Sequence, residues 1–180
     1  MRTEPDDPLF LHEAMLFTIS VHGTQTRKYT REPYWPHCAA VAAITASVTD
    51  DKRTIAAAWM HDVLEDTDTT FGEIEDVFGV VTANLVLQVT DVSTPADGPR
   101  ATRKALDREH LAQACGRAQT IKLADLIHNT TSIVTQDPGF AKVYLQEKRL
   151  LLQVLTKGSK DLELYAWRQL HVAERQLGLL

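Results

Sequence analysis

The sequence predicts an all-α protein that folds as a single-domain bundle of about eight or nine helices. Three observations carry this prediction. Apolar residues recur with a helical period along most of the chain, no segment alternates as a half-buried strand does, and clusters of Gly, Pro and Asp divide the chain into helix-sized pieces. The 180 residues suit one domain with a sizeable core. We therefore take residues 1–180 as one domain.

The first helix is predicted after Pro8, where Phe10, Ala14 and Val21 fall on one helical face. Residues 23–36 combine glycine, prolines and polar residues, which predicts a loop. Two helices are then expected at about 37–48 and 52–61.

Thr70 and Glu73 match the capping-box pattern that begins a helix, and Gly79 is a natural helix stop. A helix at about 80–90 follows, and residues 91–99 are predicted as a loop because they hold two prolines and a glycine. The second half of the chain is expected to form helices at about 100–114, 118–135, 139–156 and 159–177.

Composition excludes several classes of protein. Hydrophobic residues make up 44% and charged residues 24% of the chain, which is ordinary for a globular protein and excludes disordered, collagen-like and disulfide-scaffold classes. The net charge of −5 argues against a general nucleic-acid binder, so no nucleic-acid polymer is expected as a partner. No Gly-rich phosphate loop is present, so Rossmann and P-loop chemistry have no support.

Cys38 and Cys115 lie far apart in apolar, helix-like stretches, which predicts two reduced core thiols and a cytoplasmic location. The N-terminus lacks the apolar segment of a signal peptide. No apolar run approaches the roughly 18 residues of a membrane span, so no membrane association is expected. The sequence carries no signal for oligomeric state.

The most informative segment holds His61 and Asp62 at the end of an apolar helix. Adjacent residues diverge by about 100° on a helix, but they can converge on one ion if the helix ends there. Imidazole nitrogen and carboxylate oxygen suit a borderline divalent metal. Taken alone, the pair could equally be a capped helix end.

Two further residues favour the metal hypothesis. His37 follows a proline at a helix start and has no apolar role there. Asp125 lies on an otherwise apolar helix face, where a carboxylate is costly to bury unless it is paired or binds a cation. Each has a plain alternative: an exposed histidine, or an aspartate paired with Lys122. Together, His37, His61, Asp62 and Asp125 form a two-His, two-carboxylate ligand set that leaves positions for water and substrate.

Glu65 and Asp66 follow His61 and Asp62 by four residues, so on a continuing helix either acid could reach a metal-bound water and take its proton. The alternative is that both are solvated surface acids. Basic residues recur beside the ligand segments and favour a phosphate ester as substrate; they are Arg27, Lys28, Arg31, Arg103, Lys104 and Lys122.

These motifs, in this order, resemble the HD-domain phosphohydrolases, and most closely the hydrolase domain of RelA/SpoT enzymes and the small alarmone hydrolases. The resemblance covers about residues 9–155 and leaves a C-terminal helix at about 159–177. The matching segments are Gly23-Thr-Gln25-Thr-Arg27-Lys28, Pro33-Tyr34-Trp-Pro-His37, His61-Asp62-Val-Leu-Glu65-Asp66-Thr67 and Lys122-Leu-Ala-Asp125-Leu-Ile-His-Asn129.

The resemblance implies an HD-type helical fold and hydrolysis of the 3′-pyrophosphate of guanosine tetra- or pentaphosphate (ppGpp or pppGpp). It implies one divalent ion, usually Mn²⁺. The family pattern assigns the residues as follows: metal ligands His37, His61, Asp62 and Asp125; residues that activate or position water, Glu65 and Asp66; and nucleotide-binding residues Arg27, Lys28, Asn129 and Ser132.

The chain departs from the family pattern near the expected nucleotide end. Pro36-His37-Cys38 replaces Asn-His-Pro, and Thr130-Thr131 stands where an arginine is usual. Two alternatives therefore stay open: an HD phosphohydrolase that acts on another nucleotide or dinucleotide phosphate, and a nucleotide sensor without turnover. All six expected metal and catalytic residues are present, which argues against the sensor.

The negative charge is concentrated in one segment. Residues 50–76 contain nine acidic and two basic residues, and the rest of the chain contains 15 acidic and 17 basic residues. The acidic segment includes His61, Asp62 and both water-activating candidates. This distribution favours a cation site with basic residues from other segments, which suits a small polyanionic nucleotide.

Overall fold

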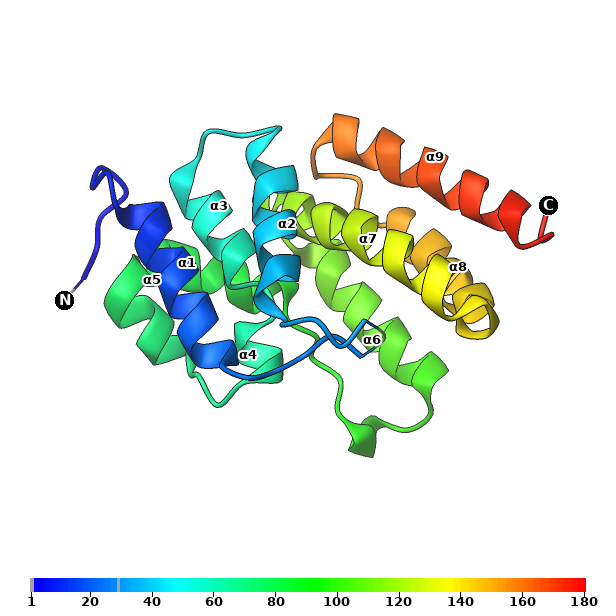
Figure 1. The fold of residues 1–180 in the computed structure, drawn as a ribbon, viewed down its shortest axis with the longest axis horizontal. Coiled ribbons are helices and arrows are strands. Elements are labelled where there is room, and N and C mark those ends of the chain that lie inside the picture. The colour runs from blue at the N-terminus through cyan, green and yellow to red at the C-terminus, as the bar shows by residue number, and fades with distance from the viewer. Residues whose placement is uncertain (1, 29) are drawn as a thin grey trace. The chain divides into compact units, whose positions relative to one another are not determined.

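The computed structural model describes residues 2–28 and 30–180 (Figure 1). Within these residues the chain forms nine α-helices, one of which is a single turn, and a short 3₁₀ turn. No strand occurs in this part of the chain, only an isolated antiparallel bridge between Thr26 and Pro33. The all-α prediction is confirmed. The chain's contacts form two compact units, residues 1–90 and 91–180, which are described one at a time.

The N-terminal unit is built around α3 (Lys52–Trp59), which packs against α1, α2 and α5. Ala56, Ala57 and Ala58 are fully buried, and their small side chains allow neighbouring helices to approach closely. The other helices of this unit are α1 (Phe10–His22), α2 (Trp35–Ala46), α4 (Val63–Asp66) and α5 (Phe71–Val89).

Asp51 caps the N-terminus of α3: its side chain accepts a hydrogen bond from the backbone N–H of Arg53 at 3.2 Å. It ends at Trp59, two residues earlier than the sequence predicts. His61 and Asp62 therefore lie in the turn before the single-turn helix α4. This break removes the 100° divergence of a continuous helix and lets adjacent side chains face the same point.

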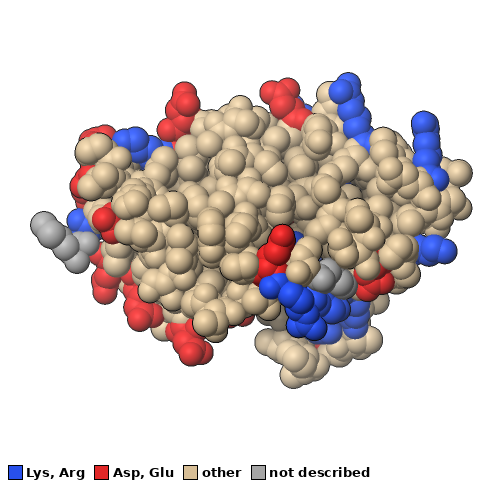
Figure 2. Space-filling model, viewed as in Figure 1, with Lys and Arg blue, Asp and Glu red and all other residues tan. Residues whose placement is uncertain are grey.

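The two local signals predicted for the segment of α5, a capping box at Thr70 and a break at Gly79, are both confirmed. The Thr70 hydroxyl accepts from the Glu73 backbone N–H at 3.3 Å, and the Glu73 carboxylate accepts from the Thr70 N–H at 2.8 Å. The Thr70 N–H and hydroxyl both donate to the Glu73 carboxylate and hold its pKa below its usual value. Gly79 has a φ of 80° and breaks the helix into two. On the face shown in Figure 2, acidic side chains gather over α4 and α5, as the charge pattern predicts.

The C-terminal unit is centred on α7 (Gly116–Gln136), which packs against both α8 (Pro138–Leu152) and α9 (Lys160–Gln176). The unit begins with the short 3₁₀ turn (Pro95–Asp97) and α6 (Arg100–Gln113), which contacts α8.

Helix α8 ends about four residues before its predicted limit, because the chain turns there toward α9. The turn passes close to α7 at Gly158: a Cβ there would lie 2.8 Å from Leu123 Cδ1 and 3.1 Å from the backbone carbon of Gln119. Glycine is the residue that permits this approach.

Cys38 is buried and Cys115 is half-buried, and they form no disulfide with each other. The predicted core position holds for Cys38, whereas Cys115 is only half-buried. Across the described residues, no helix is both long and apolar enough to cross a membrane.

Candidate metal centre and charged pocket

Three of the four predicted metal ligands converge in the N-terminal unit. His37 comes from the first turn of α2, and His61 and Asp62 come from the turn between α3 and α4. Asp62 Oδ2 lies 2.9 Å from His61 Nε2 and 3.4 Å from His37 Nε2, and the two Nε2 atoms are 3.2 Å apart. We call His37, His61 and Asp62 the metal cluster.

The donor chemistry of the metal cluster fits a cation. His61 Nδ1 lies 2.9 Å from the carbonyl oxygen of Ala58, and because a carbonyl only accepts, Nδ1 must carry a proton. In the neutral ring, Nε2 then presents a lone pair to Asp62 Oδ2, which is also an acceptor. Both histidines are buried, with 2% exposure each. An imidazole lone pair and a carboxylate oxygen 2.9 Å apart, with His37 Nε2 within 3.4 Å of both, are a donor set that suits a divalent metal.

Tyr34 orients the carboxylate of the metal cluster. Its hydroxyl donates to Asp62 Oδ2 at 2.6 Å. The Tyr34 ring stacks on His22, with centroids 4.9 Å apart, and meets His37 edge-on at 5.5 Å. A hydrogen bond from a residue outside the ligand set fixes the direction in which a ligating carboxylate points.

The two predicted water-activating acids lie beside the metal cluster on α4. Asp66 Oδ2 accepts from the Gln25 amide at 3.2 Å. Desolvation, and then the negative charge of Asp62, raise the pKa of Asp66 above its usual value, against the hydrogen bonds from Gln25 and Tyr34. Glu65 is in the same helical turn with an exposed side chain.

Two predicted nucleotide-binding residues belong to the loop before α2. The Arg27 guanidinium lies 5.6 Å from the centre of the Tyr34 ring, so it borders the metal cluster. Lys28 is exposed on the same loop. The Thr26–Pro33 bridge closes this loop.

The remaining predicted residues lie together on α7 in the C-terminal unit. Asp125 is 5% exposed, accepts from Asn129 Nδ2 at 2.5 Å and pairs with Lys122 Nζ at 3.1 Å. The Ser132 hydroxyl donates to the Asn129 carbonyl at 3.1 Å. The spacing of three and four residues brings these side chains to one face. Asp125 is thus paired with Lys122, as one alternative predicts.

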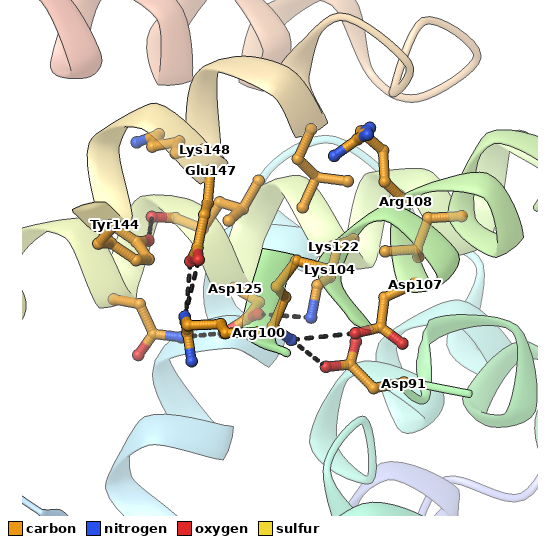
Figure 3. Close-up of a pocket in the computed structure, with 14 residues that line it drawn as sticks. Asp91, Arg100, Lys104, Asp107, Arg108, Lys122, Asp125, Tyr144, Glu147 and Lys148 are labelled. Atoms are coloured by element: carbon orange, nitrogen blue, oxygen red, sulfur yellow. Dashed lines mark hydrogen bonds and ion pairs between the residues drawn. The ribbon is translucent and has the colours of Figure 1, made fainter. Parts of the chain in front are cut away.

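Asp125 and Asn129 line a pocket of about 180 Å³ within the C-terminal unit. Most of the other polar residues that line it were not predicted as site residues, because no local pattern marks the side of a helix that faces a pocket. Its charged side chains are Asp91, Arg100, Lys104, Asp107, Arg108, Lys122, Asp125, Glu147 and Lys148. In Figure 3 they come from α6, α7 and α8 and, for Asp91, from the segment between α5 and α6.

Most of the pocket's cations are paired with carboxylates. Arg100 binds Glu147, and Lys104 pairs with Asp91 and with Asp107. Burial alone would lower the pKa of Lys104, but the two carboxylates hold it above the usual value. Burial alone would raise the pKa of Asp107. The hydrogen bond from the Ser93 backbone N–H and the charge of Lys104 outweigh burial and lower this pKa below its usual value.

Lys148 is the exception among the pocket's lysines, because its nearest partners are uncharged. Its ammonium donates to Thr130 Oγ1 at 2.6 Å and to Gln169 Oε1 at 2.8 Å. Burial lowers the pKa of Lys148 to about 7, and the charge of Asp125 acts in the opposite direction.

The HD domain family model matches residues 14–150. The chain therefore belongs to the HD domain family.

More particularly, the chain is similar to proteins named guanosine-3′,5′-bis(diphosphate) 3′-pyrophosphohydrolase MESH1. The Xenopus tropicalis protein is 36% identical over 146 residues, which cover 78% of this chain and 79% of that protein. The Drosophila melanogaster protein is 34% identical over 130 residues, which cover 70% of each chain.

A solved structure described as a metazoan ortholog of SpoT that hydrolyzes ppGpp matches with a TM-score of 0.81 and 30% identity. The match covers 95% of this chain and 97% of that one. The family and these relatives together indicate a hydrolase, and the HD hydrolase family implies a divalent metal.

Proposed function

We propose that this protein is a metal-dependent pyrophosphohydrolase that removes the 3′-pyrophosphate of ppGpp and pppGpp. Water is consumed, and the products are inorganic pyrophosphate with GDP or GTP. The observation that carries the proposal is the convergence of His37, His61 and Asp62 in a chain 36% identical to a protein named for this activity.

We propose Mn²⁺ as the divalent ion, held by the metal cluster. Asp125 is proposed as a further ligand on its motif position alone. When bound, the ion supplies positive charge that polarises a phosphoryl oxygen and makes a nearby water more acidic.

Asp66 and Glu65 are proposed to take the proton of the attacking water. The raised pKa of Asp66 makes its carboxylate a stronger base than a solvated aspartate. Gln25 donates to Asp66 Oδ2 and Tyr34 donates to Asp62 Oδ2, so one oxygen of each carboxylate is held by a hydrogen bond.

The substrate is proposed to be a small pyrophosphorylated nucleotide. Arg27 and Lys28 would bind its phosphates or stack on its base, and Asn129 and Ser132 would offer amide and hydroxyl groups. The pocket around Asp125 and Asn129 is also lined by cations, which can attract phosphate.

We further propose that residues 1–180 act as one HD domain, because the family match at residues 14–150 runs across both units. The cytoplasmic location stays a proposal that rests on the reduced cysteines.

The test is turnover of ppGpp and pppGpp by the purified protein with Mn²⁺, with pyrophosphate and orthophosphate measured separately. We expect pyrophosphate and no orthophosphate. Release of orthophosphate, or turnover of other nucleotides alone, would favour the alternative HD phosphohydrolase, which the Thr130-Thr131 departure keeps open.

A further inference from the structure

The pair formed by Arg100 and Glu147 occupies one side of the pocket (Figure 3). Arg100 Nε and Nη2 donate to Glu147 Oε1 and Oε2 at 2.7 and 2.8 Å, which is a planar, two-point pair. A guanidinium binds a phosphate group through the same two-point geometry. Glu147 therefore occupies the face of Arg100 that a phosphate would use.

The charge balance of the pocket shows why the Glu147 carboxylate matters for binding an anion. Five cationic and four anionic side chains line the pocket, so its positive charge is almost cancelled before a ligand enters. An anionic substrate must compete with these carboxylates for the cations.

Glu147 differs from Asp107 and Asp125, each of which also accepts a hydrogen bond from a group other than a lysine. Asp107 also accepts the backbone N–H groups of Val92 and Ser93, so it holds the chain before α6. Asp125 also accepts from Asn129. Among the described residues, the only polar side chain that contacts Glu147 is Arg100.

We propose that Glu147 is a specificity-determining residue that masks Arg100 and so limits how many phosphates the pocket accepts. This inference rests on the proposed function. The two proposed substrates differ by one phosphate, and the masking carboxylate disfavours the more highly charged one, pppGpp.

The direct test is Glu147→Gln, which keeps the shape of the side chain and removes its charge. The variant both frees the guanidinium and removes a repulsive charge, and both changes favour the ligand with more phosphates. We expect the KM for pppGpp to fall relative to the KM for ppGpp by about threefold or more, the range of a partly exposed ion pair. Steady-state kinetics separates this change from any change in kcat.

Arg100→Gln is the opposite variant and tests the same pair. It leaves the Glu147 charge without its partner, so the KM for pppGpp should rise relative to that for ppGpp. Opposite shifts from the two variants are expected only if the pair sets the phosphate preference.

Glu174→Gln is the matched control. Arg149 Nη2 binds both Glu174 oxygens at 2.6 and 2.7 Å, again between two helices, but neither residue lines the pocket. Loss of this pair should leave the KM ratio of the two substrates unchanged.

The outcomes separate this inference from the proposed function. If the wild-type protein hydrolyses both substrates and Glu147→Gln shifts their KM ratio no more than Glu174→Gln does, the specificity role is wrong and the hydrolase stands. If the wild-type protein hydrolyses neither, the proposed function is wrong. Calorimetric binding of inorganic tripolyphosphate and pyrophosphate then decides the inference: a selective gain for tripolyphosphate in Glu147→Gln supports it, and equal changes overturn it.

Discussion

The metal cluster and the pocket both gather polar and charged side chains, but they balance charge in opposite ways. In the metal cluster, two acceptors, His61 Nε2 and Asp62 Oδ2, face each other at 2.9 Å. In the pocket, carboxylates already neutralise Arg100, Lys104 and Lys122. The metal cluster therefore suits a cation. In the pocket, an anionic ligand must displace carboxylates from the cations before it can bind them.

The largest effect should come from Asp62→Ala, which removes the oxygen donor of the metal cluster. We expect loss of both metal and activity, measured by calorimetric titration of Mn²⁺ and by pyrophosphate release. Asp68→Ala is the control, because Asp68 is an exposed acid of the same segment and should retain both. If Asp62→Ala bound Mn²⁺ as tightly as the wild type, Asp62 would not be a metal ligand and the contrast with the pocket would be wrong.

Asp125→Ala asks which region this residue serves. As a metal ligand it should cause the same double loss as Asp62→Ala. If Asp125 serves only to pair with Lys122, the variant will bind Mn²⁺ normally and change substrate binding alone.

Glu65→Gln and Asp66→Asn should separate metal binding from proton transfer. Loss of a general base typically lowers the rate by about 10²- to 10⁴-fold, so we expect a large fall in kcat with Mn²⁺ affinity retained. Full activity of Glu65→Gln would show that Glu65 is a solvated surface acid, and the base would then be Asp66.

Tyr34→Phe should have a smaller effect, because it removes the hydroxyl that donates to Asp62 but no metal ligand. We expect Mn²⁺ affinity to fall by about 10- to 100-fold, as for other residues that orient a ligand. Calorimetry on the metal-free protein measures this directly. An affinity equal to that of the wild type would mean that the helix turn alone orients Asp62.

The smallest effect concerns Lys148, whose charge the pocket does not neutralise with a carboxylate contact. Its pKa is about 7 in the folded protein and 10.5 ordinarily, so the unfolded chain binds more protons between these values and stability must rise with pH. We expect a gain of about 1.5 kcal/mol in the free energy of unfolding from pH 7 to pH 8.5.

Denaturant unfolding at the two pH values measures this gain, and Lys148→Met should lack it. The difference between the two proteins is the decisive quantity, because other groups titrate equally in both. An equal pH dependence in both proteins would mean that the buried lysine stays charged.

The parts of the fold with local chemical signals could be predicted from the sequence. The Thr70–Glu73 capping box and the Gly79 break appear where expected, since each depends on neighbouring residues only. Helix α4 was not predicted, because a single turn carries no periodicity. Helix α8 ends before its predicted limit, and the chain then approaches α7 closely at Gly158; no local pattern encodes this packing.

The same distinction holds for the candidate site. His61 and Asp62 could be found because they interrupt an apolar helix, and His37 because it follows a proline at a helix start. Tyr144, Glu147 and Lys148 line the pocket, yet in the sequence they belong to an ordinary amphipathic helix. Which side of such a helix faces a pocket is decided by tertiary packing.

The adjacency of His61 and Asp62 has a consequence for folding. Two ligands from consecutive residues form a chelate whose spacing is set mainly by covalent geometry, so within the metal cluster only His37 must be delivered by tertiary structure. A bound ion would then act as a removable cross-link between α2 and the turn after α3. Because an ion that prefers the folded chain stabilises it by mass action, metal supply would determine how much of the protein is folded as well as how much is active.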